Sequence, residues 1–210
     1  MNHQDLQNRL ESVLAGGHDQ RFDDVLSSLH CMSRPRVYAV LNACVSAMDP
    51  GELYVEVGTY QGGSLISALR DNDARAIGVD SFGEFKETNN QEITRRNLAT
   101  FFSVSPRVVL YNMGFKEFFA QCSANLKIQV YYYDGAHDYE TQLAGMEAAW
   151  KFLLPGSIVL VDDLTYPEVT RAVNQFISNH VGNLKIKFVM LPEQNTDEIW
   201  WNGVCVLQVI

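Results

Sequence analysis

From residue 52 onward, strand-like apolar runs alternate with stretches of helical periodicity. The runs predict strands at 52–58, 75–80, 107–111, 128–133 and 157–161. The intervening periodicity predicts helices at 63–70, 88–102, 115–121, 139–153 and 167–180. Because each helix would connect two successive strands as a crossover, the strands are expected to run parallel, with helices on both faces of the sheet. The chain is therefore predicted to fold as an α/β protein.

The end of the chain departs from this alternation. Residues 184–191 and 204–210 both look like strands, and no helical stretch separates them. Two consecutive strands without a crossover must be antiparallel. We therefore predict a doubly wound, mostly parallel, seven-stranded sheet with an antiparallel C-terminal hairpin. A plain dinucleotide-binding sheet would instead need a sixth parallel strand preceded by a helix.

Three further helical segments precede the sheet, at 4–15, 21–31 and 35–48. Two separate domains would be cramped in 210 residues. We therefore expect residues 1–48 to form an N-terminal helical extension packed on a core of residues 49–210, within a single domain.

Composition restricts the partners and the compartment. The formal net charge of −9 disfavours nucleic-acid backbones and anionic membranes. The four cysteines are scattered, the N-terminal residues have no apolar segment typical of a signal peptide, and no run approaches 18 apolar residues. We expect a cytoplasmic protein without nucleic-acid or membrane partners, for which a homodimer is permitted but not required.

Residues 53–64, LYVEVGTYQGGS, predict a buried strand, a tight turn and the start of a helix. Gly58 and Gly62 would let a polar ligand approach the backbone, and the N–H groups of the helix start would point at the same place. This arrangement favours a nucleotide-like ligand. The alternative is an ordinary strand-to-helix turn without a ligand.

Asp80 ends the next predicted strand, where a carboxylate can accept hydrogen bonds from both ribose hydroxyls of an adenosine group. NAD and S-adenosylmethionine would both satisfy it. However, the turn at Gly58 does not have the GxGxxG spacing of a pyrophosphate site, and Glu56 would repel a pyrophosphate while attracting a sulfonium or ammonium group. These features favour S-adenosylmethionine over NAD.

Acidic residues end four of the five predicted parallel strands, namely Glu56, Asp80, Asp134 and the pair Asp162-Asp163. Ligands of open α/β sheets collect beyond the carboxyl ends of the strands. Each acid by itself could simply cap the following helix. Together they predict one site at one edge of the sheet.

At these residues the chain resembles the class I S-adenosylmethionine-dependent O-methyltransferases, in the branch with catechol-type and macrolide-sugar enzymes. The similar stretches are VEVGTYQGGS (55–64), IGVDSFGEF (77–85), NMGF (112–115), YYYDGAHDYE (131–140) and LLPGSIVLVDDL (153–164). The resemblance implies a Rossmann-like methyltransferase fold, with residues 49–210 as the S-adenosylmethionine-binding domain.

The resemblance also implies roles for individual residues. Asp80 would hold the ribose, and Asp134 would orient the cofactor. The turn would hold the methionine part of the cofactor, and residues after the second and third strands would surround the adenine, although core packing is the alternative for the two phenylalanines. The remaining cofactor-binding residues implied in this way are Glu56, Gly58, Thr59, Tyr60, Gly62, Ser64, Ser81, Phe82, Met113, Gly114 and Phe115.

The same branch binds a divalent cation through acids that correspond to Asp134, Asp162 and Asp163. Oxygen ligands of this kind favour Mg²⁺ or another hard cation, which would lower the pKa of a substrate hydroxyl. The alternative is a metal-free site in which Asp163 caps the following helix. His137 matches the histidine that sugar-modifying members use as a base, and a histidine bonded to a neighbouring carboxylate at a helix start is the structural alternative.

The sequence thus predicts an S-adenosylmethionine-dependent methyltransferase that acts on a hydroxyl of a small molecule, such as a sugar, a phenol or a specialised metabolite. Asp134 and His137 would be catalytic. The alternatives are an NAD-dependent oxidoreductase and a cofactor-binding protein without catalysis. A related branch described as cephalosporin hydroxylase-like shares the same layout.

Overall fold

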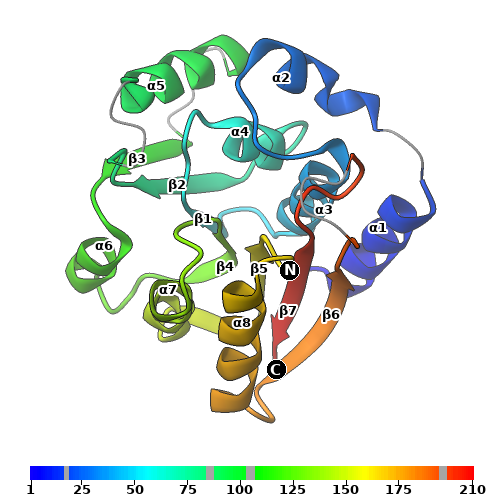
Figure 1. The fold of residues 1–210 in the computed structure, drawn as a ribbon, viewed down its shortest axis with the longest axis vertical. Coiled ribbons are helices and arrows are strands. Elements are labelled where there is room, and N and C mark those ends of the chain that lie inside the picture. The colour runs from blue at the N-terminus through cyan, green and yellow to red at the C-terminus, as the bar shows by residue number, and fades with distance from the viewer. Residues whose placement is uncertain (17–18, 84–87, 103–106, 194–197) are drawn as a thin grey trace.

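The computed structural model of the protein describes residues 1–16, 19–83, 88–102, 107–193 and 198–210. Its centre is a seven-stranded sheet in the order β3-β2-β1-β4-β5-β7-β6 (Figure 1). The strands are β1 (Leu53–Val57), β2 (Arg75–Asp80), β3 (Val108–Asn112), β4 (Ile128–Tyr133), β5 (Leu153–Asp162), β6 (Leu184–Met190) and β7 (Val204–Val209). Strands β1 to β5 pair in parallel, whereas β7 runs antiparallel to both β5 and β6. The predicted fold class is confirmed.

Helices cover both faces of this sheet (Figure 1). They are α1 (His3–Ala15), the 3₁₀ turn η1 (Gln20–Phe22), α2 (Asp23–Ser28), α3 (Pro35–Ser46), α4 (Gly63–Leu69), α5 (Asn90–Phe101), α6 (Phe115–Gln121), α7 (Tyr139–Trp150) and α8 (Pro167–Asn179). Residues of α1, α3 and α4 share one apolar cluster with the sheet, and residues of α6, α7 and α8 share another. Among the described residues, no helix combines the length and apolar character needed to cross a membrane.

The alternation of side chains along each strand explains these two clusters. In β1, Val55 and Val57 belong to the cluster with α6 to α8, whereas Tyr54 belongs to the cluster with α3 and α4. Successive side chains of a strand point to opposite faces, so Glu56 lies on the same face as Tyr54. Because both faces are buried, the central strands read as continuous apolar runs.

The boundary between α7 and β5 differs from the predicted one. The helix ends at Trp150, and the strand begins at Leu153, within the segment predicted to be helical. Leu153 pairs with Ile128, and the register between β4 and β5 then shifts before Val130. Pairing with a distant strand decides this boundary, which local periodicity cannot reveal.

The N-terminal helices pack directly on the sheet. Leu6 and Leu10 of α1 lie in the same apolar cluster as Leu41 of α3 and Tyr54 of β1. Helices α3 and α4 are also joined through Asn42, whose side-chain amide donates to the carbonyl oxygens of Ser67 at 3.0 Å and Arg70 at 2.8 Å. These contacts satisfy carbonyl groups at the end of α4 that have no partner within the helix.

The order of the strands reverses between β1 and β4. From β1 the chain proceeds outward through β2 to β3, and it then returns to the other side of β1 as β4. In open α/β sheets, the carboxyl ends of the strands at such a reversal border the usual ligand crevice. A ligand is therefore expected beside the turns that follow β1, β2, β4 and β5.

Candidate active site

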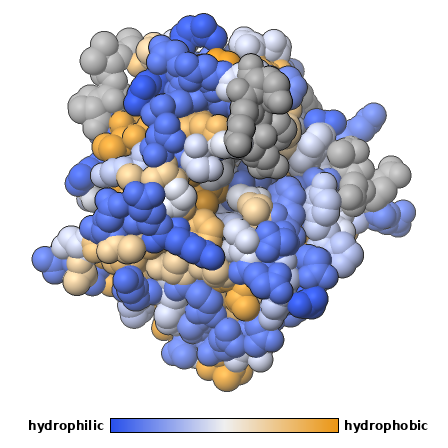
Figure 2. All heavy atoms as spheres, turned by 60° about the vertical axis from the view of Figure 1, so that its left-hand side comes forward, coloured by the Kyte–Doolittle hydropathy of each residue, from blue (hydrophilic) through white to orange (hydrophobic). Residues whose placement is uncertain are grey.

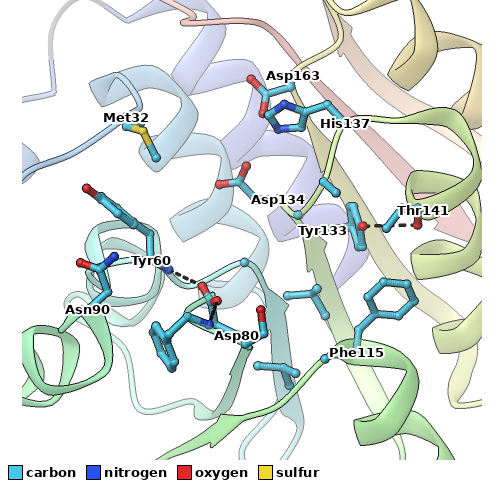
Figure 3. Close-up of a pocket in the computed structure, with 18 of the residues that line it drawn as sticks. Met32, Tyr60, Asp80, Asn90, Phe115, Tyr133, Asp134, His137, Thr141 and Asp163 are labelled. Atoms are coloured by element: carbon cyan, nitrogen blue, oxygen red, sulfur yellow. Dashed lines mark hydrogen bonds and ion pairs between the residues drawn. The ribbon is translucent and has the colours of Figure 1, made fainter. Parts of the chain in front are cut away.

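A cavity of about 460 Å³ lies at this edge of the sheet, a size typical of small-molecule sites. In Figure 2, hydrophobic residues gather in the middle of the face shown, between more hydrophilic surfaces. The close-up in Figure 3 places Asp80 and Phe115 at one end of the cavity and Met32, His137 and Asp163 at the other. The predicted site residues that line it are Gly58, Tyr60, Asp80, Ser81, Phe82, Met113, Gly114, Phe115, Asp134, His137 and Asp163.

Five predicted residues do not line this cavity. Glu56, Thr59 and Ser64 are buried behind its wall, Gly62 caps the start of α4, and Asp162 is buried at the end of β5. The carboxyl ends of the strands therefore form two groups of acids. Asp80, Asp134 and Asp163 reach the cavity, whereas Glu56 and Asp162 lie beneath it.

Asp80 holds the turn after β1 in place. One oxygen of its carboxylate accepts hydrogen bonds from the backbone N–H groups of Thr59 at 2.9 Å and Tyr60 at 2.8 Å. The other oxygen accepts from the N–H of Phe82 at 2.6 Å (Figure 3). A carboxylate offers about four acceptor positions, so one remains for a ligand that enters this end of the cavity.

The glycine of the turn serves the protein's own packing. Gly58 has a φ of +88°, and an added Cβ would lie 1.8 Å from the backbone oxygen of Asp134. A side chain at this position would thus collide with the turn after β4. We expected a ligand to use the space beside Gly58, but the turn after β4 fills it. The absence of a side chain at Gly58 lets the turns after β1 and β4 meet at the cavity.

Glu56 is fully buried and is bonded by two hydroxyl groups. Tyr54 and Ser64 both donate to its carboxylate, with Ser64 at 2.9 Å. Burial raises the pKa of Glu56 to about 8, so this side chain is mostly neutral near pH 7. The attraction that we expected between Glu56 and a cationic ligand therefore requires the ligand itself to lower the pKa of Glu56.

Asp134 and Asp162 are linked through Tyr132. The tyrosine hydroxyl lies 2.6 Å from Oδ2 of Asp162 and 3.3 Å from Oδ2 of Asp134. Burial, followed by the charges of Asp162 and Asp163, raises the pKa of Asp134 well above its usual range. Burial and the charge of Asp163 likewise raise the pKa of Asp162, to about 7. Acids held this closely favour a shared proton or a bound cation.

His137 is held by two neighbours. Its Nε2 lies 2.8 Å from Oδ2 of Asp163, and its ring stacks on that of Tyr166 with centroids 4.9 Å apart. The other oxygen of Asp163 accepts a hydrogen bond of 2.5 Å from the side-chain amide of Asn202. A carboxylate that orients an imidazole in this way is the usual partner of a histidine that accepts protons.

The donor atoms of Asp134, His137 and Asp163 all lie within 4.8 Å of one another. They form the group of possible metal ligands that the described residues contain, and Asp162 is not part of it. We predicted Asp162 as a ligand because the resemblance implies that the acids after the fifth strand bind the cation. Side chains alternate along a strand, however, and the carboxylate of Asp162 instead meets the buried hydroxyl of Tyr132.

Strained backbone is concentrated at the cavity. Five described residues other than glycine have positive φ angles, and four of them line it: Tyr60, Phe82, Asp163 and Trp201. Such conformations cost of order 1–3 kcal/mol each and persist where the surrounding structure enforces them. Strain of this kind clusters at functional sites in other proteins, and its position here favours the cavity as the candidate site.

Several lining residues are not among the individual site residues that were predicted from the sequence. They are Met32, Asn90, Tyr133, Thr141, Tyr166, Trp201 and Asn202, together with backbone neighbours of the predicted residues. Trp201 and its neighbour Trp200 stand out in the sequence, but a pair of aromatic residues in a hairpin loop usually packs against the sheet. No local signal connects Asn202 to Asp163, because the two are 39 residues apart.

Comparison with known proteins agrees with this fold. Residues 55–164, more than half of the chain, match the family model of the methyltransferase domain. The protein therefore belongs to the methyltransferase domain family. The match contains the turn after β1, Asp80, the segment around His137, and Asp163. No curated protein matches the sequence.

Solved structures of methyltransferases share the fold. An O-methyltransferase from Bacillus cereus in complex with S-adenosylhomocysteine has a TM-score of 0.68 at 14% identity, and the alignment covers 100% of both chains. The O-methyltransferase TomG from Streptomyces achromogenes, involved in tomaymycin synthesis and solved with S-adenosylmethionine, has a TM-score of 0.67 at 15% identity, covering 99% of this chain and 96% of its own. The methyltransferase PaMTH1 from Podospora anserina, bound to S-adenosylhomocysteine, has a TM-score of 0.64 at 12% identity, covering 91% and 86%.

These likenesses establish the Rossmann-like methyltransferase fold for the full length of the chain. The prediction of a methyltransferase is confirmed by the family match, and the alternative of an NAD-dependent oxidoreductase is not favoured.

Proposed function

We propose that this protein transfers the methyl group of S-adenosylmethionine to a hydroxyl group of a small molecule, with His137 as the base. Residues 49–210 would form the S-adenosylmethionine-binding domain that contains the site. Residues 1–48 would be a helical extension packed on this domain. The observation that carries the proposal is a single cavity with the Asp80 turn at one end and the His137–Asp163 pair at the other.

The end of the cavity near Asp80 suits an adenosine group. Asp80 offers a carboxylate to the ribose, and Phe82, Met113 and Phe115 offer apolar surfaces to the adenine ring. Tyr60 and Asp134 lie between this end and His137 (Figure 3), where the methionine part would extend. Loss of its proton would give Glu56 a negative charge beneath the cavity. This charge would stabilise the cationic groups of the cofactor.

The chemistry required of the protein is modest. S-adenosylmethionine, when bound, supplies an already activated methyl group. The Nε2–H of His137 would donate a hydrogen bond to Asp163, so that Nδ1 accepts the proton of the acceptor hydroxyl. The oxygen–methyl bond would form as the sulfur–methyl bond breaks, with S-adenosylhomocysteine as the leaving group. The walls of the cavity hold the reacting groups in line and exclude water.

The direct test uses purified protein, S-adenosylmethionine and a panel of sugars, phenols and hydroxylated amines, with formation of S-adenosylhomocysteine as the readout. We expect turnover with at least one hydroxylated acceptor, and binding of S-adenosylmethionine but not of NADH by calorimetry. Binding of S-adenosylmethionine without turnover on any acceptor would instead favour a cofactor-binding protein without catalysis.

We also propose that the cluster of Asp134, His137 and Asp163 lies at a binding site for a divalent cation. The two carboxylates have mutually repelling charges that a cation would neutralise, and their oxygen atoms suit Mg²⁺ or Mn²⁺. Asp162 would support the site from below as a further negative charge. The cation would lower the pKa of the acceptor hydroxyl.

Removal of the metal is therefore expected to reduce turnover without affecting cofactor binding. We expect EDTA to lower the rate at least about tenfold, because loss of even a hydrogen-bond partner of a metal ligand costs this much or more. Added Mg²⁺ or Mn²⁺ should restore the rate. The affinity for S-adenosylhomocysteine, measured by calorimetry with and without EDTA, should stay the same. Full activity after thorough chelation would refute the metal site and leave His137 as the base of a metal-free reaction.

A further inference from the structure

We propose that Asn202, in the loop between β6 and β7, is a positioning residue that fixes Asp163 and thereby sets the orientation and tautomer of His137. The inference deepens the proposed function and rests on it for the catalytic meaning of His137. The coupling between the side chains of Asn202, Asp163 and His137 can be measured without any methyl acceptor.

The three side chains form a row of contacts in which each oxygen of Asp163 has a different partner. The amide of Asn202 donates to Oδ1 of Asp163 at 2.5 Å, while Oδ2 of the same carboxylate lies 2.8 Å from Nε2 of His137. Asn202 and Asp163 are 3% and 5% exposed. Hydrogen bonds to a charged group in such a buried position are stronger than surface ones. Asn202 thus holds the carboxylate with one oxygen facing His137.

Backbone hydrogen bonds also hold Asn202 and Gly203 beside Asp163. The N–H of Asp163 donates to the carbonyl of Gly203 at 3.1 Å, and the N–H of Thr165 donates to the carbonyl of Asn202 at 2.9 Å. Gly203 has a φ of +85°, and a Cβ there would lie 2.4 Å from the backbone oxygen of Met190. Residues 202 and 203 therefore pack against Asp163 on one side and the end of β6 on the other.

Asp163 needs such support because its own backbone is strained. Its φ is +64°, in the left-handed region that non-glycine residues rarely adopt. The turn directs its side chain into the cavity, whereas Asp162 points to the buried Tyr132. Without the amide of Asn202, the carboxylate could rotate about its side-chain bonds and leave Nε2 of His137.

Two further contacts tie this loop to the N-terminal segment. The guanidinium of Arg34 lies over the ring of Trp201 at 4.5 Å, and that of Arg36 lies over the ring of Trp200 at 5.4 Å. A cation held over the face of an aromatic ring is attracted by the ring's electrons. The two contacts hold the residues immediately before Asn202, so that its side chain reaches Asp163 in one orientation.

The test compares Asn202→Ala with a matched variant elsewhere in the protein. Asn179 donates to Oε1 of Glu147 at 2.7 Å, and Oε2 of Glu147 lies 2.9 Å from Nε2 of His180. This is the same sequence of asparagine, carboxylate and histidine, but it lies outside the cavity. Asn179→Ala therefore removes the same type of contact without touching the proposed site.

Nitrogen-15 NMR of the imidazole groups reports the tautomer directly. The signals of His137 are assigned by their loss in His137→Gln. We expect wild-type protein and Asn179→Ala to show His137 with its proton on Nε2, and Asn202→Ala to show a mixture of tautomers at His137. An unchanged His137 signal in Asn202→Ala would overturn the proposal.

The kinetic readout separates positioning from folding. With an acceptor from the panel, we expect kcat of Asn202→Ala to fall about 10- to 100-fold, by analogy with the loss found when a carboxylate that orients a metal-bound histidine is disturbed. The KM for S-adenosylmethionine and the affinity for S-adenosylhomocysteine should not change. If Asn202→Ala does not fold, Asn202→Leu provides a side chain of nearly the same shape that has neither the donor nor a charge, and the same two readouts apply.

The outcomes for this inference and for the proposed function are distinct. A changed His137 tautomer in a protein that methylates no acceptor would support the positioning role and refute the proposed catalysis. A methyltransferase in which Asn202→Ala alters neither the tautomer nor kcat would support the catalysis and refute the role of Asn202.

Discussion

Replacement of His137 by glutamine is expected to lower methyl transfer about 100- to 10,000-fold, the usual contribution of a general base. The amide of glutamine can still donate a hydrogen bond to Asp163, but it cannot accept a proton from the substrate. The cofactor end of the cavity, around Asp80, is unchanged by this substitution. The affinity for S-adenosylhomocysteine, measured by calorimetry, should therefore equal that of the wild type.

His180→Gln is the matched control for this experiment. His180 also lies beside a carboxylate, that of Glu147, and it stacks on Trp150 rather than facing the cavity. We expect its turnover to be close to that of the wild type. If His137→Gln kept more than about a tenth of the wild-type rate, another group would have to remove the proton, and a metal-activated hydroxyl would be the first candidate.

Asp80→Ala is expected to weaken binding of S-adenosylhomocysteine about 10- to 100-fold. One hydrogen bond from a ribose hydroxyl to the remaining acceptor position of this charged group contributes about 1.5–3 kcal/mol, and every 1.4 kcal/mol corresponds to a factor of ten. Asp80 also accepts three backbone hydrogen bonds from Thr59, Tyr60 and Phe82. Its loss would therefore loosen the turn as well as remove the ribose contact.

The two contributions can be separated with a modified ligand. We expect wild-type protein to bind the 2′-deoxy analogue of S-adenosylhomocysteine more weakly than S-adenosylhomocysteine itself. The Asp80→Ala variant should bind the two ligands with equal affinity. The control is Asp73→Ala, which removes an almost fully exposed carboxylate that pairs with Arg107 near the surface. Equal affinities of both ligands in the wild type would show that the 2′-hydroxyl of the ribose does not contact Asp80.

Together these experiments divide the cavity into a cofactor end and a reaction end. Loss at Asp80 should change binding of the cofactor product, whereas loss at His137 or Asn202 should change the rate at full cofactor occupancy. This separation follows from their positions, since the Asp80 turn and the His137–Asp163 pair lie at opposite ends of one cavity (Figure 3). A variant that altered both would indicate that its main effect was on folding.

Much of the fold could be predicted from the sequence, because secondary structure depends largely on local patterns. The parallel strands and the antiparallel ending were read from apolar runs and the helical periodicity between them. The acids at the strand ends were found in the same way, since the carboxyl ends of parallel strands meet at one edge. These local features established the methyltransferase fold and the general place of the site.

The roles of the individual acids depended on side-chain direction, which the sequence does not specify at the end of a strand. Asp162 and Asp163 are adjacent, yet one meets Tyr132 beneath the cavity and the other faces His137. The positive φ of Asp163 produces this difference. Likewise, burial beside Tyr54 and Ser64 raises the pKa of Glu56 to about 8 and makes this glutamate mostly neutral.

The sequence by itself determined the order of the elements and the group of acids at the edge of the sheet, because both arise from local periodicity and from the rules of strand connection. Only the tertiary structure decided which acids reach the cavity and that Asn202 completes the arrangement around His137. The physical reason is that these contacts join residues distant in the chain. Their geometry is set by the pairing of β5 with β7 and by the strained turn at Asp163.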